Sequence, residues 1–123
     1  MPRARSTLLP LAARTAAATP VQQYEYDSNG VIIYLNVTAA SGTGGLTVQL
    51  RGFNNEGAAV VFFAATAVTS TGNRTYVCSP WNLSAAANGI TAIAGVPLPM
   101  RFDVNVAHGD GSSYTYSLIA EVF

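Results

Sequence analysis

The sequence predicts an all-β fold, an antiparallel β-sandwich of immunoglobulin-like or jelly-roll kind with about seven strands. Apolar and polar residues alternate with a period of two over several segments, which is typical of half-buried strands. Clusters of Gly, Asn, Asp and Ser separate these segments at intervals of about eight to twelve residues, the spacing expected of a sandwich. The length of 123 residues suits one domain with a single core. The Cys-Trp-Cys pattern of true immunoglobulin domains is absent.

The C-terminal segment carries the clearest strand pattern. Phe102, Val104 and Val106 alternate with polar residues, and the same alternation runs from 114 to 122. The sequence Gly-Asp-Gly at 109–111 lies between these two arms, and glycine adopts the left-handed backbone of a tight turn. The segment therefore predicts an antiparallel hairpin.

Further strands are expected earlier in the chain. A first strand covers 21–26 and ends at the turn sequence of 27–30. Residues 31–38 are apolar on both faces, which indicates a central or interfacial strand. The alternation of 46–51 predicts that this segment pairs with 31–38 as a second hairpin, joined through the glycine-rich residues 39–45.

The middle of the chain is less regular. The run AAVVFFAATAV at 58–68 could be a buried strand or a helical turn, and the flanking turn sequences favour the strand. A short strand at 74–79 ends at Pro80. Its Cys78, the single cysteine, is expected to be a small buried hydrophobe. Residues 81–99 predict a long loop with one helical turn at 84–88, of the kind that is functional or interfacial.

The N-terminal residues 1–18 are predicted to form an extended or disordered arm outside a single domain of 19–123. Two interpretations stay open beside a targeting peptide, namely a disordered tail and an arm that becomes ordered on another subunit. Leucines would anchor such an arm, and arginines would reach a polar or acidic rim. These residues are Leu8, Leu9 and Leu11, and Arg3, Arg5 and Arg14.

The composition excludes some classes of partner. Half of the residues are hydrophobic, only 10% are charged, and the formal net charge is zero. Nucleic-acid binding needs clustered basic residues, which the body of the chain lacks, so no nucleic-acid partner is expected. No apolar run reaches the roughly 18 residues of a membrane span, so no membrane partner is expected. A surface with so little charge favours association with neighbours, although an uncharged monomer surface would look alike.

No catalytic residue, cofactor or metal site is predicted. His108, the single histidine, stands near Asp110 and could form a catalytic couple or half of a metal site, but turn chemistry is the commoner role of such a pair. Zinc would need more ligands at fixed spacing, and the turn at 27–30 matches a calcium loop poorly. Trp81, Tyr24, Tyr26 and Tyr34 could stack on sugar rings, although buried structural aromatics are more common. The expectation is a non-enzymatic protein.

Three segments of the sequence resemble those of a known protein family. They are the lead-in RTAAAT, the segment VIIYLNVTAASGTGGLTVQLRGFN and the terminal RFDVNVAHGDGSSYTYSLIAEVF. Together, from about Arg14 to the end, they resemble small virion proteins of tailed bacteriophages, in particular head decoration or cement proteins. The resemblance implies a protein on the outer surface of the capsid, bound to the major capsid protein near two-fold or three-fold axes. Neighbouring copies of the chain, as dimers or trimers, are further implied partners.

The irregular segments are the expected contacts with that lattice, because a cement protein must reach across the seams between subunits. The predicted contact residues are Arg3, Arg5, Leu8, Leu9, Leu11, Arg14, Trp81, Leu83, Ile90 and Ile93. A carbohydrate-binding or host-adhesion module that uses Trp81 is the main alternative. Another small component of the tail or neck also fits the sequence, whereas the single histidine disfavours a hydrolase.

Overall fold

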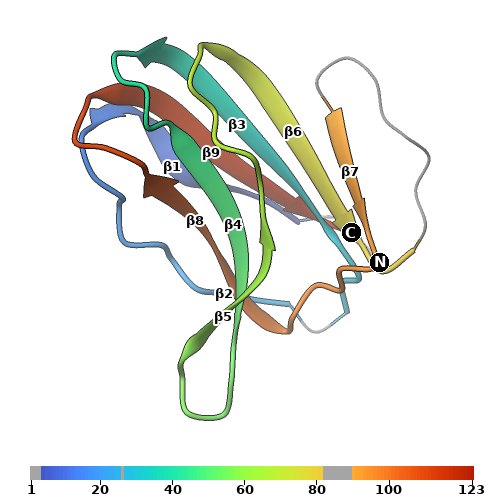
Figure 1. Cartoon of the computed structure of the whole chain (residues 1–123). Helices are drawn as coiled ribbons and strands as arrows, with labels where there is room; N and C mark the ends of the chain where they lie inside the picture. Colours follow the sequence, from blue (N-terminus) through green and yellow to red (C-terminus); the bar gives the residue numbers. More distant parts are fainter. Residues whose placement is uncertain (1–3, 26, 82–89) are drawn as a thin grey trace.

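The computed structural model describes residues 4–25, 27–81 and 90–123, and it confirms an all-β sandwich of two sheets (Figure 1). The strands of these residues are β1 Ala4–Arg14, β2 Gln23–Tyr24, β3 Val31–Ala40, β4 Leu46–Phe53, β5 Ala59–Ala64, β6 Gly72–Ser79, β7 Ile90–Ala94, β8 Arg101–His108 and β9 Tyr114–Val122. Sheet A has the order β1-β9-β3-β6-β7, and sheet B has the order β2-β8-β4-β5. Neighbouring strands are antiparallel except for β6 and β7, which are parallel.

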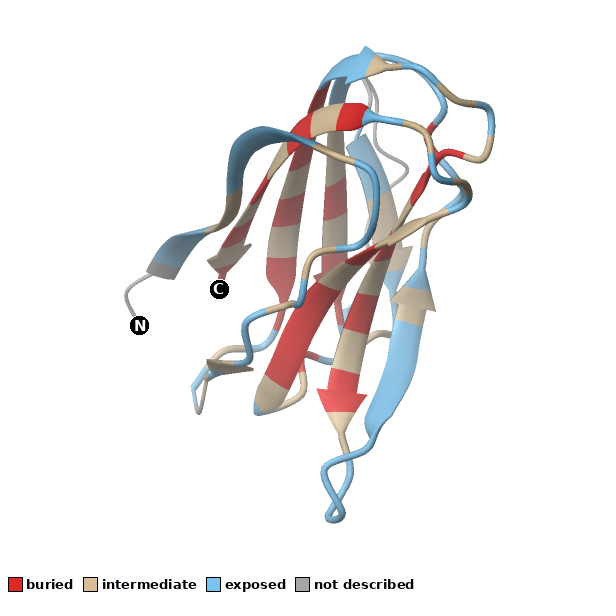
Figure 2. Ribbon diagram, turned by 90° about the vertical axis from the view of Figure 1, so that its left-hand side faces the viewer, coloured by how far each residue is buried: buried red, intermediate tan, exposed pale blue. Residues whose placement is uncertain are grey.

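The core fills the space between the sheets, and the alternation of the sequence predicts which residues enter it. Every second residue is buried along β3 and along β9, and Figure 2 shows these residues as bands across the strands. Full burial of one aliphatic or aromatic side chain contributes about 1.5–3 kcal/mol, so this layer is the main source of stability. β3 lies between β9 and β6, which confirms the expected central position.

Neither predicted hairpin is present. β3 pairs with β6 and β9 in sheet A, whereas β4 pairs with β5 and β8 in sheet B. The terminal strands are likewise divided, with β8 in sheet B and β9 in sheet A. Each connection, through residues 41–45 and 109–113, therefore crosses from one sheet to the other. Because of the crossing, the apolar faces of two consecutive strands lie on opposite sides of the core and face each other. In a hairpin, the two strands would lie side by side in one sheet and their apolar faces would point the same way.

The two crossing connections pack against each other. Ser41 donates its backbone N–H to the carbonyl of Ser113 at 3.1 Å, and Gly109 donates to that of Gly45 at 2.9 Å. A Cβ atom on Gly109 would collide with the backbone oxygen of Gly44, so the close approach requires glycine there. Gly45 has the left-handed backbone, with φ of 79°. The positive-φ glycines do not include Gly109 or Gly111, which corrects the expectation for the Gly-Asp-Gly turn.

Asp110 joins the two connections through its carboxylate. The backbone N–H of Gly44 donates to Oδ2 at 2.7 Å and that of Thr43 at 3.2 Å. Oδ1 accepts bonds from the N–H of Ser112 at 3.1 Å and from the hydroxyl of Tyr114 at 3.0 Å. These donors, first of all Gly44, lower the pKa of Asp110 below its ordinary value of 3.8. The role of Asp110 as a turn residue is thus confirmed, and its bonds reach a second loop.

This arrangement predicts an acid-dependent loss of stability. Because the folded-state pKa of Asp110 is lowered, its charged form stabilises the fold above the unfolded-state pKa, and this contribution is lost as the pH falls through the folded-state pKa. Urea unfolding of the wild type and of Asp110→Asn between pH 2 and pH 7 measures the difference. We expect the two free energies of unfolding to converge toward the acid end. A constant difference over the whole range would contradict this role.

The N-terminal segment lies within the sandwich, which differs from the expected arm outside it. β1 pairs with the edge of β9 over residues 4–14, and Leu8 and Leu9 pack against the core. The register of the pair shifts twice, and Pro10, which lacks an N–H to donate, lies within the second shift. The sandwich therefore begins before the boundary expected at residue 18. The physical reason is that β9 would otherwise present an unpaired edge to solvent.

The long segment after β6 also contains more structure than expected. Within residues 81–99 the chain forms β7, and the N–H of Val96 donates to the carbonyl of Ser79 at 3.0 Å. β7 lies parallel to β6 and forms an edge of sheet A. The helical turn expected at 84–88 lies outside the described residues. The first expected strand, at 21–26, is reduced to β2, which pairs with β8.

Candidate interaction surface

The edge strand β5 exposes a run of large apolar side chains. Val60 is 46% exposed, Val61 50% and Phe62 42%. β5 pairs with β4 on one side only and is the last strand of sheet B. Its six residues, AVVFFA, include no charge and no proline, the features that usually protect an edge strand from pairing with another chain. The strand at 58–68 is thus confirmed, but its expected burial is wrong.

An irregularity in β5 explains why apolar side chains point both inward and outward. The register with β4 shifts between Leu50 and Arg51, so that Phe62 is an additional residue in the pair. Phe63 packs against the core and lies 6.0 Å from the ring of Tyr76 in β6. Phe62 fills the space beside Gly52, where a Cβ atom would come within 2.8 Å of its ring. The absence of alternation in this segment therefore reflects a bulged edge.

A groove of about 510 Å³ lies next to this edge, between the two sheets. Phe63 and residues 64–70 form one side, and the other side consists of Arg74 and Tyr76 of β6 with Thr91 and Ile93 of β7. We refer to this feature as the β5–β7 groove. Its volume falls in the range of ligand sites, and Phe63 and Ala64 are the residues of β5 that line it, so it lies beside the C-terminal end of that strand.

Arg74 carries the positive charge of the groove, whose other polar groups are hydroxyls of threonine, serine and tyrosine. Its guanidinium donates to Oγ of Ser70 at 3.0 Å and to the carbonyl oxygen of Thr71 at 3.4 Å, both uncharged acceptors. Burial raises the pKa of Tyr76, and the positive charge of Arg74 opposes that rise. Arg74 is the one charged side chain among the described residues that line the groove. The groove therefore combines apolar side chains and hydroxyl groups with a single cationic side chain.

The predicted N-terminal contact residues lie at the opposite edge of sheet A from β7. Leu8 and Leu9 are half-buried against their own core, while Leu11 is 55% exposed. The guanidinium of Arg5 lies over the ring of Tyr34, at 5.3 Å from its centroid. Arg14 lies 4.8 Å from the centroid of the Tyr116 ring and donates to the carbonyl of Tyr116 at 2.7 Å. Four of these residues thus hold β1 to the same chain.

The other predicted contact residues lie near β6 and β7. Trp81 is 53% exposed and stacks on Phe123, with ring centroids 6.2 Å apart. Ile90 is 43% exposed, and Ile93 is half-buried in the lining of the β5–β7 groove. Arg3 and Leu83 lie outside the described residues. The structure therefore separates the predicted contacts into two edges and brings only Ile93 to the groove.

His108 and Cys78 have structural environments. Nε2 of His108 lies 2.8 Å from the hydroxyl of Tyr116, whereas Asp110 bonds to other donors, so the two do not form the couple considered from the sequence. Burial and, to a smaller extent, Arg14 lower the pKa of His108. Cys78 is fully buried, as expected, and burial raises the pKa of its thiol to about 12. A thiol with this pKa is protonated at neutral pH and is a poor nucleophile.

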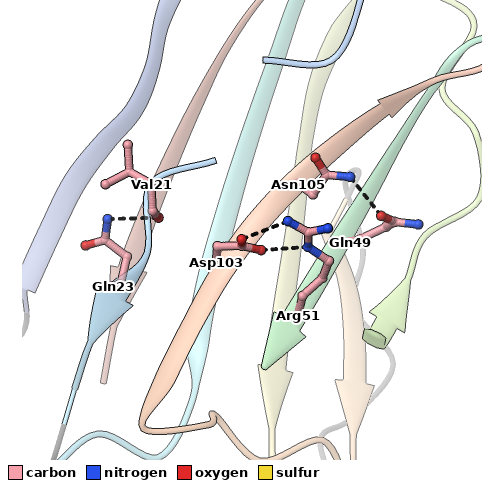
Figure 3. A network of polar contacts seen from close by, with 6 residues as sticks. All are labelled: Val21, Gln23, Gln49, Arg51, Asp103 and Asn105. Atoms are coloured by element: carbon pink, nitrogen blue, oxygen red, sulfur yellow. Dashed lines mark hydrogen bonds and ion pairs between the residues drawn. The ribbon is translucent and has the colours of Figure 1, made fainter. Parts of the chain in front are cut away.

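An ion pair crosses the outer face of sheet B (Figure 3). Arg51 of β4 donates from Nε and from Nη2 to the two carboxylate oxygens of Asp103 of β8, each at 2.8 Å. The side chain of Asp103 is 3% exposed, and that of Arg51 is 23% exposed. The neighbouring pair, Asn105 and Gln49, is joined by a hydrogen bond of 2.9 Å. These cross-strand pairs hold β4 against β8 in register.

The ion pair yields a stability prediction. Arg51→Gln leaves the Asp103 carboxylate buried without its bidentate partner, which should cost about 2 kcal/mol of unfolding free energy. Gln49→Ala, which removes the neighbouring neutral bond, is the matched control and should cost about 1 kcal/mol or less. Chemical denaturation at pH 7 measures both. Equal losses in the two variants would contradict a special cost for leaving the Asp103 charge without its partner.

The described part of the chain shows no candidate metal cluster and no candidate membrane-spanning helix. No group of three or more His, Cys, Asp or Glu residues there is placed to hold a metal ion. No helix within it has the length and hydropathy that a membrane crossing needs.

Known proteins provide no further guide to this surface. The chain matches no protein-family model, no curated protein and no solved structure.

Sequence reasoning missed most of this surface. The sequence predicts contacts in the segments that lack alternation at 1–18 and 81–99, whereas the exposed apolar residues belong to the bulged strand β5. The one signal was the lack of alternation in the run at 58–68, which fits a bulged edge strand as well as a buried one.

Proposed function

We propose that this chain is a non-enzymatic structural protein of a phage virion, which binds the outside of the capsid lattice and stabilises it. The observation that carries the proposal is the exposed apolar edge of β5. Although a bulge at Phe62 interrupts it, this edge has no charge or proline and can serve as a template for pairing with another chain. The capsid as partner comes from the resemblance of the sequence to decoration proteins, with the major capsid protein as the expected contact.

The low charge of the chain supports the same role. With 10% charged residues and a net charge of zero, the surface favours association over dispersal in solution. Rigid β-sandwiches with a paired N-terminal strand also suit a load-bearing position between subunits. The chain would act through many copies, each bound at an equivalent site.

Trp81 favours a second candidate, a carbohydrate-binding or host-adhesion module. Its ring is more than half exposed and stacks on Phe123, so that two aromatic rings stand together near the surface. Exposed aromatic faces stack on sugar rings in many sandwich proteins. This candidate uses a different part of the molecule from the β5 edge, so variants can separate the two.

The test mixes the purified chain with capsids that lack it and measures the bound copies by co-sedimentation and image reconstruction. We expect saturable binding at equivalent lattice positions. The double variant Val60→Thr and Val61→Thr keeps the size and β-branching of both side chains but removes exposed apolar groups. It should lower the occupancy several-fold and leave the melting temperature nearly unchanged.

Trp81→Ala is the matched variant for the second candidate. Because the proposal assigns the lattice contact to β5 in place of the Trp81 expected from the sequence, this variant should bind capsids like the wild type. Full capsid occupancy by the Val60 and Val61 variant would contradict the role of β5. Absence of any lattice binding, with glycan binding that Trp81→Ala abolishes, would favour the adhesion module.

A further inference from the structure

The two sheets have unequal numbers of strands, and the difference falls at β7. Sheet A has five strands and sheet B has four among the described residues. β6 lies opposite β5, as the contact between Phe63 and Tyr76 shows, and β7 extends sheet A past β5 (Figure 1). The β5–β7 groove is the space beneath this overhang. It lies where a further strand of sheet B would continue the sandwich.

We propose that the β5–β7 groove binds one extended segment of a partner protein, which adds to β5 as a strand, directs apolar side chains into the groove and places an acidic side chain at Arg74. This proposal assumes that the β5 edge is a binding surface, and in that respect it rests on the proposed function. Its test uses peptides and no capsid, so the strand-addition proposal and the capsid proposal can fail independently.

The main chain of β5 can accept such a strand. Neighbouring strands lie about 4.8 Å apart and exchange backbone hydrogen bonds, which an edge strand leaves unmade on its outer side. β5 has no proline or charged residue to prevent this pairing. Main-chain bonds of this type give affinity, and pockets for alternate side chains give specificity.

The lining of the groove specifies the side chains of the segment. Phe63, Val68 and Ile93 supply apolar surface, so residues of the added strand that face them should be apolar. Threonine and serine hydroxyls make up much of the remaining lining and can accept small polar residues. Arg74 supplies the cationic wall, and the oxygens that it contacts on Ser70 and Thr71 are uncharged. A carboxylate of the segment would give Arg74 a charge-assisted hydrogen bond in a partly buried setting. The charge of the groove therefore favours an acidic segment.

A second copy of this chain fits the groove poorly. Suppose that the β5 strands of two copies paired about a two-fold axis. The β5 of the second copy would then lie beneath the β7 of the first copy. The second copy's own β6 covers its β5 from the same side, so this β6 and the first copy's β7 would collide. The overhang thus admits a single strand and excludes the edge of a whole second sandwich. The N-terminal segment of a neighbouring copy carries Arg5 and Arg14 and no acid, so its charge would oppose Arg74.

The test selects binders from a surface-displayed library of random ten-residue peptides with the purified full chain. Thr91→Tyr fills the groove from β7, and Thr7→Tyr places the same residue at an exposed position of β1, at the other edge of sheet A. In the selected peptides, apolar residues should alternate with polar ones, and Asp or Glu should be present. These peptides should bind the wild type and Thr7→Tyr but not Thr91→Tyr. Arg74→Gln should weaken the acidic peptides about fivefold and leave their Gln counterparts unaffected.

Several outcomes would overturn the proposal. They are the failure of the library to yield a binder, peptides that bind Thr91→Tyr as well as the wild type, and enrichment of basic peptides. Concentration-dependent dimerisation of the wild type that Thr91→Tyr abolishes would show that a second copy occupies the groove. Both tyrosine variants must retain the melting temperature of the wild type. If Thr91→Tyr has a lower melting temperature, Thr91→Arg replaces it, because arginine fills the same space with a more flexible side chain.

Discussion

The contact between the two crossing connections is the constraint on which the sandwich depends. At this point the backbones of Gly44 and Gly109 approach so closely that no side chain fits between them. The Asp110 carboxylate then accepts bonds from the amides of the opposite connection. Because each connection changes sheets here, the contact fixes which strands become neighbours. β3 consequently joins β9, and β4 joins β8.

The two sheets have unequal numbers of strands because the other strands are added unevenly around the central strands β9, β3, β8 and β4. β1 and β2 extend the sheets on one side, whereas β5, β6 and β7 extend them on the other. On the first side each sheet gains one strand, β1 beside β9 and β2 beside β8. On the second side β7 has no counterpart in sheet B among the described residues, and the apolar edge of β5 stays exposed beneath it. The surface to which we assign binding is thus a direct result of the topology.

The strands and the core could be predicted from the sequence because a two-residue alternation depends only on which face of a strand is buried. The burial of alternate residues in β3 and β9 agrees with that prediction. The pairing could not be predicted, since a hairpin and a crossing between sheets require the same alternation and similar glycine-rich turns. The exposed edge of β5 was missed for a related reason, because an apolar run without alternation fits a bulged edge and a buried strand equally. The sequence predicts an arm over 1–18 because these residues combine arginines and small residues with a short apolar run interrupted by Pro10, yet an irregular edge strand tolerates both arginine and proline.

The central claim is that β5 is an open edge in the free protein, and backbone hydrogen exchange by NMR on the dilute full chain tests it most directly. We predict slow exchange throughout β4 and β9, which have neighbours on both sides. Along β5, amides directed at β4 should be protected, and those directed outward should exchange nearly as fast as in an unfolded chain. Uniform protection of β5 at the level of β4 would mean that its edge is already covered, and this result would contradict the account.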